Sequence, residues 1–175
     1  MEIYITDLAA YNNGHLIGEW VSLPMSKNDL NLKISEILLR GTEVCNKDEI
    51  HEEFFITDYE CDFMEIGEYD DIYNLNDIAA KMERMNEHFQ KITKFLLSNN
   101  LVNNLNKAIE EVENVIIHKN STMEDIAYEF VNEHYDIGSL APIIANAIDY
   151  QKIGRELSCD GRYFEEEGDI YEYLV

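Results

Sequence analysis

Carboxylates are the side chains whose number and spacing in this sequence point to a function. Eleven of them lie between residues 48 and 71, a stretch without Lys or Arg. They are Asp48, Glu49, Glu52, Glu53, Asp58, Glu60, Asp62, Glu65, Glu68, Asp70 and Asp71. Carboxylates this dense suit acid–base catalysis, cation binding or contact with a basic macromolecule.

The acidic stretch is expected to be folded, because apolar side chains are interleaved with the acids. Eight aromatic, aliphatic or Met side chains lie between residues 54 and 69, enough to join a core. Asp58, Glu60 and Asp62 alternate, so on an extended chain they share one face at a spacing of about 6.6 Å. Like charges placed in this way repel and destabilise the fold. The pattern therefore favours a use for these acids.

The net charge of −23 and the pI near 4.3 argue against binding to nucleic acids or anionic membranes. A basic protein surface is the natural partner. The charge divides unevenly: residues 1–70 carry a net −12, residues 71–120 a net −1 and residues 121–175 a net −10. Solubility alone does not require two acidic ends around a nearly neutral middle.

The motif search favours neither a metal site nor a catalytic site. The five histidines lack HExxH spacing, and no phosphate-binding glycine loop is present. Asp58-x-Glu60-x-Asp62 begins like a calcium loop, but Phe63 occupies the position of the required Gly and Tyr69 that of the final Glu. We therefore expect no enzymatic activity, cofactor or metal. An enzyme or calcium-dependent protein that uses a few of the acids stays open as an alternative.

The beginning of the chain predicts a cytoplasmic protein. MEIYITDL lacks the basic flank and long apolar run of a signal peptide. No stretch approaches the roughly 20 apolar residues that span a membrane. The three widely spaced cysteines, without a CxxC motif, are typical of reduced thiols.

The pattern of elements predicts an α+β protein of three units: residues 1–70, 71–113 and 114–175. The first unit has strands at 2–6, 16–23 and 52–57, and a helix that Ser26 caps and Gly41 ends. In the middle unit, apolar residues at spacings of three and four predict one helical face from Leu75 to Leu96, capped by Asn74 or Asn76. A second helix near residues 101–112 follows.

The last unit is expected to contain a strand, a capped helix and a closing hairpin. The strand is at 115–118, and a helix capped by Ser121 or Thr122 continues to about Tyr135. A short apolar helix at 140–148 and a hairpin of residues 162–166 and 170–174 follow. Each end unit thus has a short antiparallel sheet, with a helical middle between them.

Two further groups of acids extend the candidate binding surface. The predicted helix carries an acidic stripe within about 80° of its circumference, made of Asp125, Glu129, Glu133 and Asp136. The hairpin adds Glu165, Glu166 and Glu167. Carboxylates on alternate strand positions and successive helical turns give anions about every 5–7 Å. Duplex DNA presents one phosphate per roughly 1.7 Å of axis when both strands are counted. A folded protein decorated with rows of anions can offer a DNA-binding groove the charge pattern it expects.

Both ends of the chain resemble the ArdA-type antirestriction proteins. The matching residues at the beginning are Ile3-Tyr4-Ile5, Leu8, Tyr11-Asn12, Gly14, Leu16, Gly18 and Trp20. Those at the end are Asp149-Tyr150, Gly154-Arg155, Leu157, Gly161, Phe164, Gly168 and Tyr171. The middle matches only in element order and acidity. The matched glycines and Trp20 have the character of positions that maintain the fold.

The resemblance implies an elongated, curved homodimer that mimics bent B-form DNA. Such proteins occupy the DNA groove of type I restriction–modification enzymes, block restriction and often modification, and are carried by conjugative plasmids and transposons. For the dimer interface we expect the crowded apolar residues Leu140, Ile143 and Ile144. The alternative is an acidic adaptor that binds another basic protein, such as a DNA-binding repressor.

Overall fold

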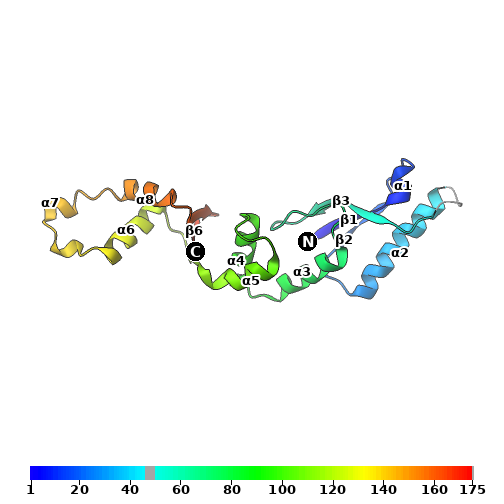
Figure 1. Ribbon diagram of the computed structural model, residues 1–175, viewed down its shortest axis with the longest axis horizontal. Coiled ribbons are helices and arrows are strands. Elements are labelled where there is room, and N and C mark those ends of the chain that lie inside the picture. The colour runs from blue at the N-terminus through cyan, green and yellow to red at the C-terminus, as the bar shows by residue number, and fades with distance from the viewer. Residues whose placement is uncertain (46–49, 175) are drawn as a thin grey trace. The chain divides into compact units, whose positions relative to one another are not determined.

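The computed structural model describes residues 1–45 and 50–174 and contains two compact units, Met1–Ile109 and Glu110–Val175. Each unit has one three-stranded antiparallel sheet, and helices separate the two sheets along the chain (Figure 1). The predicted α+β class, with short antiparallel sheets toward both ends and a helical middle, is confirmed. The division into three units stays a prediction; here the middle of the chain up to Ile109 belongs to the first compact unit.

The first sheet has the order β2-β1-β3, with β1 (Glu2–Asp7) between β2 (Gly18–Ser22) and β3 (Phe54–Glu60). Alternating residues of β1 point into the core, where Ile3 and Ile5 are fully buried. Helix α1 (Leu8–Asn12) follows β1, and α2 (Lys27–Val44) packs on the sheet (Figure 1). Ser26 caps α2 as predicted, since its Oγ accepts a hydrogen bond from the Asp29 N–H at 3.1 Å.

Gly41 does not end α2, contrary to the prediction, and the reason is a buried hydrogen-bonded pair of side chains. His51 Nδ1 lies 2.6 Å from Asp7 Oδ2, and these side chains are 1% and 0% exposed. A Cβ at Gly41 would collide with the Asp7 carboxylate and lie 2.8 Å from His51 Nδ1. Glycine is therefore needed at position 41 for close approach, while the helix continues for three more residues. The pair anchors residue 51, near the beginning of the acidic stretch, to β1.

The middle of the chain forms α3 (Ile72–Arg84), α4 (Glu87–Ser98) and α5 (Leu105–Glu111). The single helical face predicted from Leu75 to Leu96 is therefore wrong. The chain turns at Met85, and Asn86 begins α4 by accepting the Phe89 N–H at 2.9 Å. Both helices bury apolar residues at helical spacing, so the periodicity continues across the break.

The predicted cap of α3 is also corrected. Asp71 begins this helix and accepts N–H groups of its first turn. Asn76 is buried instead: its Oδ1 accepts the Met25 N–H at 2.8 Å, and its Nδ2 donates to the Met25 carbonyl at 3.0 Å. Asn76 thus ties α3 to the segment that follows β2.

The second unit contains β4 (Val115–His118), β5 (Tyr163–Glu166) and β6 (Asp169–Tyr173) in the order β4-β6-β5. A short 3-10 helix precedes β4, at Val112–Asn114. The predicted closing hairpin is confirmed. Its turn places Glu167 and Gly168 at φ of 52° and 83°, the two positive values that a type I′ turn needs.

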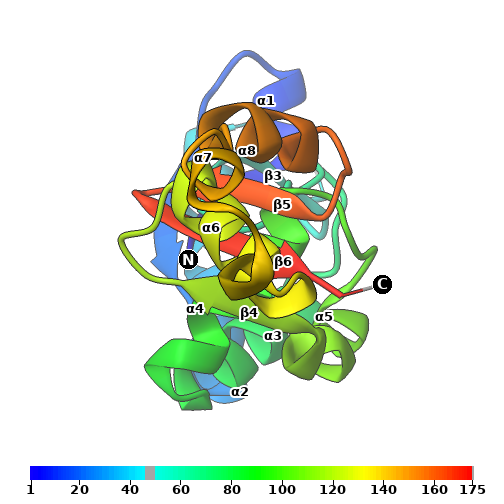
Figure 2. The ribbon, with the colours of Figure 1, turned by 90° about the vertical axis from the view of Figure 1, so that its left-hand side faces the viewer.

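Helices α6 (Met123–His134), α7 (Pro142–Ala145) and α8 (Tyr150–Ser158) lie between β4 and β5 along the chain, and a second 3-10 helix, Ile137–Ser139, precedes α7. Helix α8 was not predicted. It packs beside α6 at Gly154, where a Cβ would collide with the Met123 carbonyl (Figure 2). None of the helices in the described parts of the chain is long and apolar enough to cross a membrane.

Candidate functional site

The described carboxylates of the acidic stretch all lie on the surface, on the segment just before β3, on β3, on the loop after it and at the start of α3. The exposed residues are Glu52, Glu53, Asp58, Glu60, Asp62, Glu65, Glu68, Asp70 and Asp71. The candidates Asp48 and Glu49 lie outside the described residues. This loop and its flanking elements thus form a continuous stretch of chain with an exposed acid at nearly every second or third residue.

The predicted row of three carboxylates on one strand face is reduced to two. Asp58 and Glu60 lie within β3, opposite Tyr4 and Glu2 of β1, so Glu60 faces another acid. The strand ends at Glu60, and Asp62 belongs to the next turn. Asp62 Oδ2 is 2.6 Å from Lys94 Nζ of α4. The hydrogen bond from Lys94 lowers the pKa of Asp62, against an opposing effect of partial burial.

Three aspartates of the stretch accept hydrogen bonds from nearby backbone. Asp58 Oδ1 accepts the Tyr59 N–H at 2.8 Å, and Asp70 Oδ2 accepts the Gly67 N–H at 2.8 Å. Asp71 Oδ1 accepts the Tyr73 N–H at 2.9 Å as the cap of α3. The short aspartate side chain favours such local bonds. Part of each of these carboxylates is therefore committed to the fold.

The glutamates of the stretch are different. Within residues 1–45 and 50–174, the side chains of five of them form no hydrogen bond or ion pair: Glu52, Glu53, Glu60, Glu65 and Glu68. Their longer side chains reach past their own backbone into solvent. These glutamates are the acids of the stretch that are most available to a partner.

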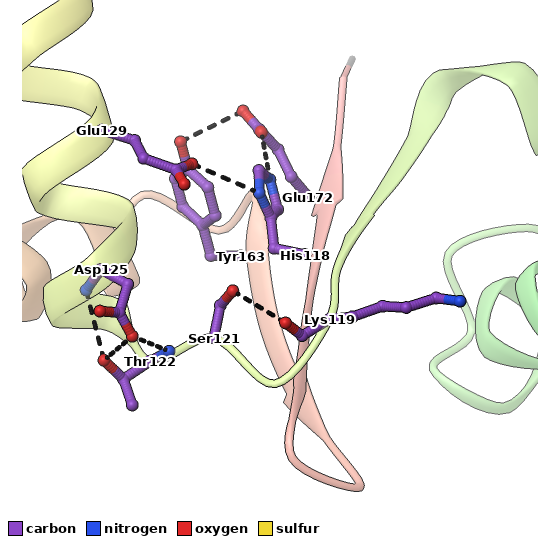
Figure 3. Close-up of polar contacts among 8 residues, drawn as sticks. All are labelled: His118, Lys119, Ser121, Thr122, Asp125, Glu129, Tyr163 and Glu172. Atoms are coloured by element: carbon purple, nitrogen blue, oxygen red, sulfur yellow. Dashed lines mark hydrogen bonds and ion pairs between the residues drawn. The ribbon is translucent and has the colours of Figure 1, made fainter.

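The acidic stripe on α6 also contains both acids that are bonded within the fold and acids that are not. Thr122 N–H and Oγ donate to Asp125 Oδ2 at 2.8 and 2.6 Å, which closes a capping box (Figure 3). These hydrogen bonds lower the pKa of Asp125. Glu129 Oε2 lies 3.8 Å from His118 Nδ1. Glu133 and Asp136 are exposed, and among the described residues neither carboxylate has a partner.

A polar cluster behind Glu129 was missed by sequence reasoning. His118 Nε2 lies 3.1 Å from Glu172 Oε2, and the Tyr163 hydroxyl donates to Glu172 Oε1 at 3.1 Å (Figure 3). Burial raises the pKa of Tyr163, and the Glu172 carboxylate adds to this. His118 and Glu172 meet diagonally across β4 and β6. The pairing register of β4 and β6 brings these side chains together, and the hydrophobic periodicity of the sequence does not reveal that register. The cluster lies beside Glu129, whose side chain stays 60% exposed.

The acids of the hairpin are not equivalent. Glu165 and Glu167 are exposed. Glu166 is half-buried, and its Oε2 is shielded from solvent without a hydrogen-bond partner in the described structure. Glu166 is therefore a poor candidate for direct contact with a partner, while Glu165 and Glu167 keep that role as predictions.

The predicted dimer residues are exposed, and an apolar pocket lies in the same unit. Leu140, Ile143 and Ile144 are 39%, 81% and 55% exposed. The pocket has a volume of about 620 Å³, and Leu140 lines it together with residues such as Phe130 and Ile153. This surface offers both a projecting apolar segment and a depression.

Comparison with known families bears on the resemblance at the chain ends. The family model described as "Antirestriction protein (ArdA)" matches residues 3–172 of the 175 residues. The chain belongs to this family. The resemblance seen at both ends is thereby confirmed, and the match also includes the middle helices. No curated protein matches the chain.

Membership of the ArdA family makes the chain an antirestriction protein and implies interaction with restriction enzymes. Two of the matched residues at the beginning, Gly18 and Trp20, are closely packed against β1. A Cβ at Gly18 would lie 2.6 Å from the Ile5 carbonyl, and Trp20 packs edge-on against Tyr4 at 5.4 Å between ring centroids. Among the described residues, no group of three or more His, Cys, Asp or Glu side chains is placed to hold a metal ion.

Proposed function

We propose that this ArdA-family protein mimics B-form DNA and inhibits type I restriction–modification enzymes by occupying their DNA-binding groove. One observation carries the proposal: exposed glutamates without partners lie on β3 and its loop, and again on α6. A chain with 36 acidic and 13 basic side chains leaves them unpaired. An enzyme groove lined with Lys and Arg for DNA phosphates would pair them.

The spacing of the acids supports a mimic of phosphates. Asp58 and Glu60 are two strand positions apart, about 6.6 Å, and Glu129 and Glu133 are one helical turn apart, about 6 Å. Exposed ion pairs contribute only about 0–1 kcal/mol each. Tight inhibition then depends on many contacts acting together, and it weakens as salt rises.

The direct test is a cleavage assay with purified type I enzyme, its DNA substrate and increasing amounts of the protein. The proposal predicts inhibition that is competitive with DNA and that weakens with added NaCl. Capture of partners from a host lysate, with and without competing duplex DNA, tests the adaptor alternative. Capture of a repressor or nucleoid protein, without inhibition of any type I enzyme, would support the adaptor and overturn the mimic.

We also propose that the protein acts as a homodimer through Leu140, Ile143 and Ile144. The support is the exposure of Ile143 together with a pocket of about 620 Å³ in the same unit. In a two-fold dimer the same surface serves both partners, so a projecting segment of one copy meets the depression of the other. Ile144→Asp should give monomers by light scattering. An unchanged dimer with unchanged dissociation would place the interface elsewhere.

A further inference from the structure

A groove in the first unit combines an apolar floor with an acidic and amide-rich rim. One wall is formed by the loop after β3 and the start of α3, the other by the connection from α4 to α5. Its volume is about 420 Å³, and Leu75, Ile78, Leu97 and Leu105 provide the floor. Leu75 and Leu105 are buried, while Ile78 and Leu97 are half-buried. Grooves of this size commonly receive a ligand or a side chain.

The rim presents oxygen atoms that accept hydrogen bonds. Glu65, Asn74 and Asn100 are exposed, and their side chains form no hydrogen bond with any described residue. Asp70 and Asp71 each use one carboxylate oxygen for local backbone, which leaves the second oxygen facing no described donor. Acceptors therefore surround an apolar depression from both walls.

We propose that this groove receives an arginine side chain of the restriction enzyme. The inference rests on the proposed function and deepens it, because it assigns one defined contact within a surface otherwise made of spread charges. The methylene stem of arginine is apolar and matches the floor of the groove. Its cationic guanidinium head matches the acidic rim. The planar guanidinium carries five N–H donors in a fixed fork, whereas the lysine ammonium has three N–H donors on a single nitrogen atom. A rim with acceptors on two walls suits the fork.

This contact differs in kind from a phosphate mimic. A DNA phosphate offers charge to a cation but no apolar slot for the methylene stem. Arginine is also enriched among interface residues that dominate binding, and these residues fill well-packed pockets. The groove therefore makes one region of the acidic surface more sensitive to substitution than the rest.

The first test uses the full-length protein and a small probe. N-acetyl-arginine methylamide is titrated against protein with labelled methyl groups, and its neutral isostere N-acetyl-citrulline methylamide is the control. We expect saturable shifts at Ile78, Leu97 and Leu105 with the arginine probe alone. Equal shifts with citrulline, or shifts spread over the acidic surface without saturation at the groove, would overturn the proposal.

The second test compares two variants that each remove one charge. Glu65→Gln changes the groove rim, and Glu60→Gln changes an exposed acid on β3 outside the groove. We expect Glu65→Gln to weaken binding to the type I enzyme about tenfold or more. Glu60→Gln should cost about fivefold or less, as for an exposed ion pair. Equal losses would overturn the groove as an anchor.

A third variant tests the groove without any change in net charge. Asn74→Leu removes a rim amide without changing the net charge, and no hydrogen bond of that amide to a described residue is lost. It should weaken enzyme binding and the arginine-specific shifts while the melting temperature stays unchanged. If the wild type inhibits but both groove variants bind like Glu60→Gln, only this inference fails. If the wild type does not inhibit, the proposed function fails, whatever the probe shows.

Discussion

Neutralising the glutamates that have no partner should weaken inhibition without harming the fold. The triple variant Glu53→Gln, Glu60→Gln and Glu68→Gln removes three exposed carboxylates that form no hydrogen bond or ion pair with a described residue. At about 0.5 kcal/mol for each lost ion contact, the total is about 1.5 kcal/mol. That corresponds to a roughly tenfold higher inhibition constant. The melting temperature should stay the same or rise, because Glu60 faces Glu2 across the sheet.

The matched control removes the same number of charges elsewhere. Glu83, Glu87 and Glu113 are exposed, lie in the nearly neutral middle of the sequence, and their side chains form no hydrogen bond or ion pair with a described residue. Changing them to Gln alters the net charge equally and should raise the inhibition constant less than twofold. Inhibition constants for type I cleavage are measured at several NaCl concentrations. Equal losses in both triples would show that only the overall charge matters, which would refute position-specific mimicry.

Three further outcomes follow from the structure. Because screening shortens from about 30 Å at 0.01 M salt to about 3 Å at 1 M, the melting temperature should rise with NaCl; a salt-independent value would contradict mutual repulsion. Asp125→Ala should lower the melting temperature by a few degrees at pH 7, whereas Glu133→Ala should not. Since the pKa of Asp125 is lowered, its contribution is present above about pH 3.9 and is lost as the pH falls through the folded pKa, so the deficit should shrink in acid. Gly154→Ala, which drives a methyl group into the Met123 carbonyl, should destabilise the protein by about 1–3 kcal/mol in urea unfolding; no change would mean that α6 and α8 separate easily.

Local signals in the sequence were sufficient for much of the fold. Ser26 caps its helix as predicted, and Thr122 is the cap among the two predicted candidates Ser121 and Thr122, because capping depends on a side chain and the next three residues. The closing hairpin was predicted because turn residues are likewise a local signal. The error at Gly41 has a physical cause. A glycine within a helix costs about 1 kcal/mol, so Gly41 suggested a helix end. Close packing against other segments overrides that local preference.

The sequence predicted that the candidate acids are exposed. It did not predict which of them form hydrogen bonds or ion pairs within the fold. Composition and alternation are sufficient to expect acids on the surface. They do not show that Asp62 is held by Lys94, because that contact joins residues 32 positions apart. Nor do they show that Asp125 completes the capping box of α6 while Glu133, on the same helix, forms no hydrogen bond or ion pair with a described residue. Such differences depend on side-chain length and on what the fold brings near.

The helix starts explain how the chain carries its charge with few cations. Asp7, Asp71 and Asp149 each cap a helix, and Asp125 lies in the first turn of another. There the partial positive charge of the peptide dipoles stabilises a carboxylate, an effect that fades within one turn. A Lys or Arg side chain that stabilised the same carboxylate would instead cancel its full negative charge. The backbone instead stabilises each acid at close range and leaves the net charge unchanged at a distance. The long-range field that draws a basic partner into encounter therefore keeps its full strength, so the fold gains stability without slowing association.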